Sequence, residues 1–159
     1  MSTDVSLRKM IREDLPYVNF VRNHDLTRHF LRNTQKISLD ETYTWFDTTS
    51  PTWYLIMVDQ EIVGYIRTSQ DAGESICIGC DVHPDKRGKG YAKAAYKKVI
   101  ADLYSTGYHV IWLEVFENNH NALSLYKRLN FQEVNKRQVG DRHAIVMVHI
   151  KEINQEEKY

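Results

Sequence analysis

The chain has few cysteines and no surplus of charge of either sign. Its 159 residues include two cysteines, and 21 basic residues balance 21 acidic ones, which leaves a formal net charge of zero. Proteins that bind nucleic acid usually carry a basic surplus, so a DNA or RNA partner is disfavoured. No apolar run approaches the roughly 18–20 residues needed to cross a membrane, and this argues against a membrane protein.

The N-terminal sequence, Met-Ser-Thr-Asp-Val-Ser, has neither the basic start nor the apolar stretch of a secretory signal. We therefore expect a cytoplasmic protein. The length is sufficient for one domain with its own core, which we place at residues 1–151. Residues 152–159 form a charged tail, which we expect to fray.

The two cysteines, Cys77 and Cys80, form a Cys-x-x-Cys pattern. In the strand expected there, residues three apart point to opposite faces, so the two thiols are poorly placed to share a metal or form a disulfide. The sequence has no second cysteine pair and no histidine at zinc-finger spacing. We therefore expect no metal site and assign both cysteines to strand packing.

What the chain does contain is a glycine-rich turn, Asp81–Ala92, between an expected strand and an expected helix. Gly88 and Gly90 allow the backbone to approach a ligand closely and to adopt conformations closed to other residues. Free N–H groups in such a turn, together with the positive end of the helix dipole, form an anion site. Arg87 and Lys89 add positive charge. We therefore expect the turn to hold a phosphate or pyrophosphate group.

Two familiar phosphate loops do not fit this turn. A Walker loop requires Gly-Lys-Ser/Thr, and a dinucleotide fingerprint requires a third glycine. The pattern that fits is Arg-x-x-Gly-x-Ala, filled by Arg87, Gly90 and Ala92. It resembles the pyrophosphate loop of the GCN5-related N-acetyltransferases (GNAT), which bind acetyl-coenzyme A (acetyl-CoA).

A second motif lies downstream, from Asn119 to Phe131. It resembles the second signature of the same family, Asn-x-x-Ala-x-x-Leu-Tyr-x-x-x-Gly-Phe, and departs from it at Asn130, where glycine is usual. That position ends a helix in the left-handed conformation, for which asparagine is the next-best residue.

Hydrophobic periodicity predicts a mixed order of strands and helices. The expected strands are 6–10, 53–58, 62–68, 75–82, 108–115, 131–138 and 143–150, and the expected helices are 14–23, 26–30, 38–48, 90–104 and 119–129. Ser38 and Glu41 form a capping box at the start of one helix. The resemblance implies the GNAT fold, a mixed α/β architecture with a twisted sheet of about seven strands and about four flanking helices. It also implies that the strand before the glycine-rich turn splays from the next one to admit the pantetheine arm.

Transfer of an acetyl group from a thioester to an amine requires a base for the amine and a proton for the leaving thiolate. The resemblance assigns the general acid to Tyr126, whose phenol is protonated at neutral pH. Glu114, 12 residues earlier, is placed like the general base of ribosomal-protein alanine N-acetyltransferases. Asp81, His83 and His120 remain rival bases.

The resemblance also implies a set of coenzyme contacts. Backbone N–H groups near Cys80–Val82 would polarise the thioester carbonyl. Asn119 would cap its helix and contact the coenzyme. The full set is Cys80, Asp81, Val82, Arg87, Gly88, Lys89, Gly90, Tyr91, Ala92, Asn119 and Tyr126.

The amine acceptor is less well defined. The N-terminal third loosely resembles acetyltransferases that act on amino-sugar nucleotides, whereas the spacing of Glu114 and Tyr126 favours a protein or peptide N-terminus. Three arginines either hold a nucleotide phosphate or solvate a helix face, and three aromatic residues are more typical of a core than of a sugar platform. These residues are Arg22, Arg28 and Arg32, and Trp45, Phe46 and Trp53.

The sequence thus predicts an acetyl-CoA-dependent N-acetyltransferase, either monomeric or homodimeric. The acceptor is a small-molecule or peptide amine. The alternative is a non-catalytic module of the same fold that binds acyl-CoA or acts as an inhibitor. Such a module would be expected to lack the acid or the intact turn, and this chain has both.

Overall fold

Seven strands form one mixed sheet in the computed structural model, which describes residues 4–71 and 73–151. Their order across the sheet is β1-β2-β3-β4-β5-β7-β6, and every neighbouring pair is antiparallel except β4 and β5. The mixed α/β fold predicted from the sequence is confirmed, while the tail predicted at 152–159 lies outside the described residues. The strands are β1 (Ser6–Lys9), β2 (Tyr54–Val58), β3 (Glu61–Gln70), β4 (Ser75–Val82), β5 (Val110–Phe116), β6 (Phe131–Val139) and β7 (Arg142–His149).

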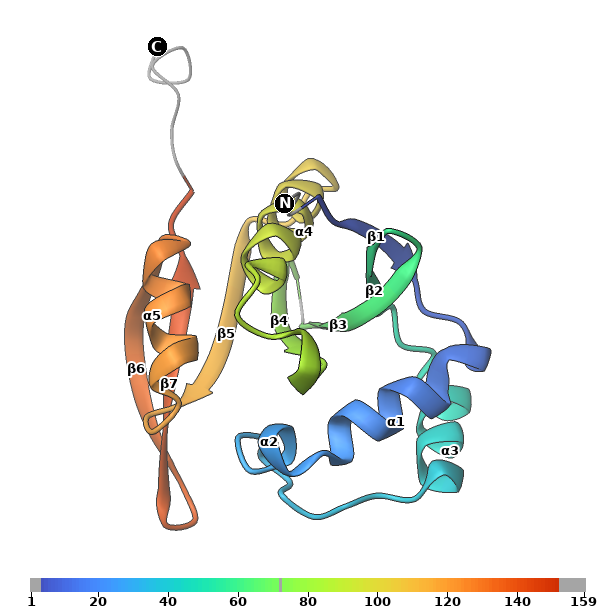
Figure 1. The fold of residues 1–159 in the computed structure, drawn as a ribbon. Coiled ribbons are helices and arrows are strands. Elements are labelled where there is room, and N and C mark those ends of the chain that lie inside the picture. The colour runs from blue at the N-terminus through green and yellow to red at the C-terminus, as the bar shows by residue number, and fades with distance from the viewer. Residues whose placement is uncertain (1–3, 72, 152–159) are drawn as a thin grey trace.

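Five α-helices flank this sheet in the described part of the chain, against the four or so expected (Figure 1). The additional helix is α2, which periodicity predicted at 26–30; it is a single turn that His24 caps by accepting a hydrogen bond from the N–H of Leu26. The α-helices are α1 (Leu15–Asn23), α2 (Asp25–Arg28), α3 (Leu39–Thr49), α4 (Tyr91–Ser105) and α5 (His120–Arg128). Two short 3₁₀ helices, η1 (Arg12–Asp14) and η2 (Pro84–Lys86), complete the set. None of the helices in the described ranges is long and apolar enough to cross a bilayer.

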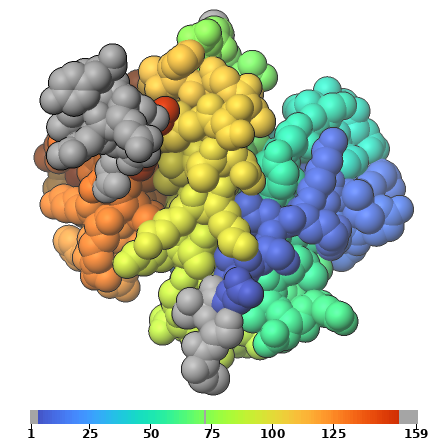
Figure 2. Space-filling view, turned by 90° about the horizontal axis from the view of Figure 1, so that it is seen from above, coloured from blue at the N-terminus to red at the C-terminus, as the bar shows by residue number. Residues whose placement is uncertain are grey.

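The helices cover the two faces of the sheet separately. The larger core packs α4 and α5 against one face, and a second core packs α1 and α3 against the other face of β2 and β3. In Figure 2 the segment containing α4 (yellow) lies between the C-terminal residues (orange) and the N-terminal residues (blue and teal). The two faces of the sheet are therefore built by different parts of the chain.

Alternation along the strands decides which residues meet which helices. Ile78 of β4 and Leu113 of β5 are buried in the larger core. Cys80 packs against that core, whereas Cys77, an odd number of residues away, belongs to the opposite face. The prediction that the two thiols point to opposite faces is confirmed, and both are free.

Local signals in the sequence end the elements where expected. Ser38 accepts a hydrogen bond from the N–H of Glu41, and Glu41 accepts one from the N–H of Ser38, so the capping box that begins α3 is confirmed. Asn130 has a φ of 68°, the left-handed conformation predicted after α5.

The sheet opens where β4 and β5 run side by side. Their parallel ladder joins three residue pairs, from Ser75 opposite Val110 to Cys77 opposite Trp112. Beyond Cys77 the two strands diverge, and Figure 1 shows β5 leaning away from β4. The remaining residues of both strands therefore flank a wedge in the middle of the sheet, as the resemblance implied.

Candidate active site

A cavity of about 570 Å³ lies at the open end of the wedge between β4 and β5. Its wall combines the end of β4, the glycine-rich turn, the first turns of α4, residues along the whole of α5, and residues of α2. The residues that line it are Leu26, Thr27, Phe30, Cys80, Asp81, Val82, Arg87, Gly88, Gly90, Ala92, Lys93, Tyr96, Asn118, Asn119, His120, Asn121, Ala122, Leu125, Tyr126 and Arg128. Most of the predicted coenzyme contacts thus converge on one cavity.

The glycine-rich turn presents its backbone to this cavity. Gly88 and Gly90 have φ values of 78° and 82°, which side-chain-bearing residues rarely adopt. A Cβ at Gly88 would meet nothing within 4 Å, so conformation rather than space requires glycine there. Gly90 begins α4 and offers no side-chain cap, which leaves the first N–H groups of α4 for an anion.

Arg87 has a role that the sequence did not suggest. Its guanidinium donates to the carbonyl of Val82 at 3.0 Å, the carbonyl of Leu26 at 3.0 Å and Oγ1 of Thr27 at 2.9 Å. These bonds tie the end of β4 to α2. The predicted positive charge is present at the cavity wall, but the donors of Arg87 are committed to the protein.

Asn119 caps α5 as predicted. Its Oδ1 accepts from the N–H of Ala122 at 3.4 Å, and the residue also lines the cavity. His120, a rival base, is exposed at the first position of α5. His83, the other histidine candidate, stacks on Phe20 with ring centroids 5.6 Å apart.

Two tyrosines meet inside the larger core and reach the cavity. The hydroxyls of Tyr126 and Tyr96 lie 3.1 Å apart, and the rings are nearly perpendicular at 86°. Burial raises the pKa of Tyr126 to about 12 and that of Tyr96 well above its ordinary value, because a phenolate would lose its hydration. Both phenols therefore keep their protons at neutral pH.

Asp81 faces the opposite side of the sheet from this pair of phenols. Its Oδ2 lies 3.1 Å from Nε of Arg67, and its side chain is 10% exposed. Gly79, opposite Arg67 in the ladder, leaves room for the guanidinium, since a Cβ there would lie 2.6 Å from Nη2 of Arg67. Tyr65, opposite Asp81, is fully buried, and burial raises the pKa of its phenol well above the ordinary value.

Glu114 also lies on that side, in an ion pair that bridges distant parts of the chain. Its two carboxylate oxygens accept from Nε and Nη2 of Arg32 at 2.6 and 2.7 Å, and Nη1 of Arg137 lies 3.7 Å from Oε2. The Glu114 side chain is 14% exposed, against 57% for that of Arg32. Among the described residues, Tyr126 lines the cavity and Glu114 does not. The two predicted catalytic groups therefore flank the wedge from opposite faces of the sheet.

A family model for the acetyltransferase (GNAT) family matches residues 18–131. The chain belongs to the GNAT acetyltransferase family. Acetyltransferase ECA0875 of Pectobacterium atrosepticum is 32% identical over 85 residues, which cover 54% of this chain and 60% of that relative. The ribosomal protein bS18 alanine N-acetyltransferase of Haemophilus influenzae is 29% identical over 99 residues, covering 58% of this chain and 67% of that relative.

Solved structures agree on the fold. The acetyltransferase yncA of Salmonella typhimurium, determined with its cofactor acetyl-CoA, superposes with a TM-score of 0.74. The match covers 91% of this chain and 92% of that one at 17% identity, a level that shows a shared fold. The resemblance to acyltransferases of the GNAT family, predicted from two motifs, is confirmed.

The GNAT fold brings residues to the cavity that the motifs did not indicate. Lys93 and Tyr96 follow Gly90 and Ala92 on the face of α4 that lines the cavity. Both residues lie at helical spacing from the glycine-rich turn, and this periodicity in the sequence would have predicted that they face the cavity. Conversely, Lys89 and Tyr91 were predicted contacts, but neither is among the described residues that line the cavity.

The N-terminal arginines of this GNAT chain hold the segment 29–38 instead of facing solvent. Arg22 donates to the carbonyls of Gln35 at 2.5 Å and Asn33 at 2.7 Å, and Arg28 donates to the carbonyl of Thr34 at 2.8 Å. Arg22 and Arg28 thus bind the loop backbone rather than only solvating a helix face, and phosphate binding stays a prediction. The short loop carries more carbonyls than its own backbone can satisfy, and these arginines supply the donors.

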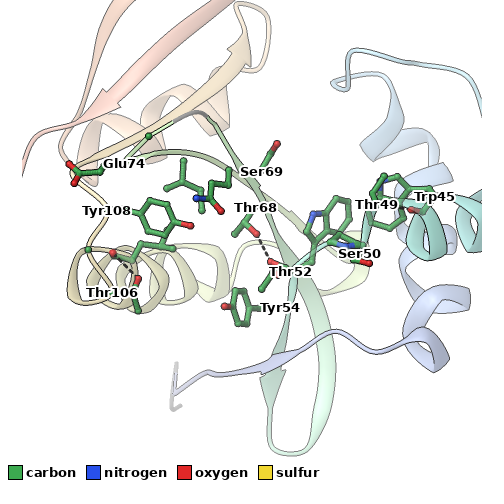
Figure 3. A pocket seen from close by; sticks show the side chains of 17 residues that line it. Trp45, Thr49, Ser50, Thr52, Tyr54, Thr68, Ser69, Glu74, Thr106 and Tyr108 are labelled. Carbon is green, nitrogen blue, oxygen red and sulfur yellow. Dashed lines mark hydrogen bonds between the residues drawn. The ribbon is translucent and has the colours of Figure 1, made fainter.

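A second cavity, of about 990 Å³, lies at the other end of β4, near Gly73 and Glu74 (Figure 3). Trp45 and Trp53 line it, and Trp53 also stacks on Tyr65 with ring centroids 5.5 Å apart. These two tryptophans pack against the second core, as predicted. Tyr126 and most of the predicted coenzyme contacts line the smaller cavity, which is therefore the candidate active site of this GNAT chain, with Glu114 outside its lining.

Proposed function

We propose that the protein is an N-acetyltransferase that transfers the acetyl group of acetyl-CoA directly to a primary amine in a ternary complex. One observation carries the proposal. The glycine-rich turn, the uncapped start of α4 and the phenol of Tyr126 open on the same cavity at a break in the sheet. Phosphate binding and proton donation are thus available at the two ends of one site.

The cavity suits acetyl-CoA part by part. N–H groups at Gly88–Gly90 and the first turn of α4 would bind the pyrophosphate. The wedge between β4 and β5 would receive the pantetheine arm, because the strand edges there have no ladder partner after Cys77. Main-chain N–H groups near Cys80–Val82 would hold the thioester carbonyl, being rigid before reaction.

The transfer exchanges one bond for another. The amine nitrogen forms a bond to the acetyl carbon, and the carbon–sulfur bond breaks. A base takes a proton from the amine, and the leaving thiolate takes one from the phenol of Tyr126. The raised pKa of Tyr126 keeps that proton in place until the thiolate forms.

Glu114 is the proposed base, and Asp81 is its rival. Both carboxylates are paired with an arginine. Arg32 is 57% exposed and can rotate away from Glu114, whereas Arg67 lies against Gly79 with less freedom to move. The carboxylate that can be released is the better candidate for accepting a proton from an incoming amine.

Two acceptor classes come from the sequence. An amino-sugar nucleotide loses one supporting feature, since Arg22 and Arg28 bind carbonyls rather than standing free for a phosphate. A protein or peptide N-terminus is supported by the position of Glu114 and by the activity of the Haemophilus relative, a ribosomal protein alanine N-acetyltransferase. A non-catalytic acyl-CoA-binding module is the alternative, which the intact turn and phenol disfavour.

Thiol release from acetyl-CoA tests the function. Amino-sugar nucleotides and short peptides with free N-termini serve as acceptors, and acetyl-CoA binding is measured separately by calorimetry. Tyr126→Phe should lower kcat by about 100-fold, since general acid catalysis contributes roughly 10²–10⁴-fold. The control is Tyr43→Phe, whose ring lies under Arg12 away from the cavity, and it should leave kcat unchanged. Tight acetyl-CoA binding without transfer to any amine would favour the non-catalytic module.

A further inference from the structure

A cluster of three charged side chains lies on the face of the sheet opposite the Tyr96–Tyr126 pair. Arg32 and Arg137 converge on the carboxylate of Glu114, which leaves the cluster with one more positive than negative charge. Arg32 holds Glu114 through both oxygens, the strongest geometry for an arginine and a carboxylate. An amine that approaches Glu114 must therefore displace Arg32 first.

The backbone that carries Arg32 is held in place independently of its side chain. Arg142 donates to the carbonyls of His29 at 3.3 Å and Arg32 at 3.0 Å, and its guanidinium lies 3.7 Å from the centre of the Phe116 ring. The Arg32 side chain can rotate while its Cα stays fixed over β5. A displaced guanidinium then remains beside Glu114, where it is available to an anionic group of a ligand.

We propose that the acceptor is a zwitterion of the α-amino acid type. Its ammonium takes the place of Arg32 on Glu114, and its carboxylate binds the displaced Arg32 together with Arg137. The ion pair seen in the structure is thus exchanged for two pairs with the ligand, and the cluster keeps its net charge of one positive because a zwitterion adds none. An acceptor that carries an ammonium but no carboxylate gains an ion pair with Glu114. The ion pair between Arg32 and Glu114 is then lost without replacement. The inference rests on the proposed function, because it places the reacting amine on the proposed base.

Matched acceptors test this inference. The natural α-amino acids are compared with their α-amides in the thiol-release assay. Each amide keeps the side chain and the ammonium but loses the carboxylate. We expect kcat/KM to be at least about tenfold higher for the acid, the size of one charge-assisted interaction. The amide ammonium loses its proton more readily, so intrinsic reactivity works against this result.

Two variants connect the preference to the cluster. Arg32→Gln should raise KM for the amino acid about tenfold or more and leave KM for its amide unchanged or lower. Arg137→Gln should act in the same direction while leaving Arg32 on Glu114. The control is Arg12→Gln, because Arg12 forms an exposed ion pair with Asp47 at 3.1 Å, remote from the cavity. That control should change neither KM, and thermal melting checks the fold of all three variants.

The outcomes separate this inference from the function on which it rests. An equal or higher kcat/KM for the amides would overturn the proposal of a zwitterionic acceptor. A preference for the amino acid over its amide that remains in Arg32→Gln would overturn it as well. Saturable acetyl-CoA binding with release on peptides or nucleotide sugars alone would also overturn it and leave the proposed function standing. Failure to bind acetyl-CoA would overturn both. A preference for acids that disappears in Arg32→Gln, with Arg12→Gln unchanged, would establish it.

Discussion

At the scale of single residues, the site depends on which side chains are free to move. Tyr126 is enclosed by Tyr96 and Phe131 and keeps its proton because it is buried. Glu114 is nearly as enclosed, but its partner Arg32 is exposed. The proposed acid is therefore held in place with its proton, whereas the proposed base would have to be released by the acceptor.

At Gly64, in β3, the neighbouring strand β4 leaves no room for a side chain. A Cβ at this position would lie 2.6 Å from the carbonyl oxygen of Asp81 and 2.8 Å from Cα of Val82. Because these are backbone atoms of β4, relief requires the two strands to shift. The close approach of β3 thus fixes the position of the strand end that lines the cavity.

We expect Gly64→Ala to lower the free energy of unfolding by about 2–3 kcal/mol, the upper part of the range of roughly 1–3 kcal/mol for overpacking. Gly140→Ala is the matched control. Gly140 has a φ of 62° and nothing within 4 Å of an added Cβ, so only backbone strain of about 1 kcal/mol applies. Urea unfolding measures both, and equal losses would contradict the steric explanation.

At the scale of elements, hydrogen bonds at the start of α3 and within the segment 29–38 position the helices that precede β2. The segment 29–38 is fixed by Arg22, Arg28 and Arg142, and α3 begins at the capping box of Ser38 and Glu41. These contacts hold Arg32 over β5. The capping box was visible in the sequence, whereas the arginine contacts join residues up to 113 positions apart and were not.

Loss of the cap should weaken this arrangement measurably. Ser38→Ala removes the acceptor for the N–H of Glu41 and should cost about 1 kcal/mol of stability. Ser105→Ala, at the exposed last residue of α4, should change the free energy of unfolding by less than about 0.5 kcal/mol. The free energies of unfolding of the two variants are compared from their urea midpoints, provided that the dependence on urea concentration is the same. An equal loss in both variants would argue against the cap.

At the scale of the whole molecule, burial of tyrosines links stability to alkaline pH. Burial raises the pKa of Tyr126 to about 12 from its ordinary value of 10.0. Between those values the unfolded chain loses the proton while the folded chain keeps it, so unfolding becomes easier as pH rises. Below pH 10 the contribution is fully present, and above about 12 it no longer changes.

The free energy of unfolding should therefore fall across that window, by roughly 3 kcal/mol from Tyr126 alone. The raised pKa values of Tyr65 and Tyr96 add to the fall in the same direction. Urea unfolding of the wild type and of Tyr126→Phe from pH 9 to 12 measures the difference. A variant that loses stability as steeply as the wild type would show that Tyr126 does not titrate in this way.

The sequence by itself determined the elements, the family and the glycine-rich turn that we propose as the anion site. These follow from local causes: alternation in the strands, caps and left-handed residues at helix ends, and glycines where φ is positive. The capping role of Asn119 and the left-handed conformation of Asn130 were predicted correctly because each depends on residues close in the sequence.

Only the tertiary structure decided which charges meet. Arg32 and Glu114 are 82 positions apart, and Arg67 meets Asp81 because β3 pairs with β4 in one register. Arg87 carries the charge that its motif predicted, yet its donors serve α2 and β4. A charged side chain can reach many partners in an unfolded chain, and the partner is selected only when packing removes water from the alternatives.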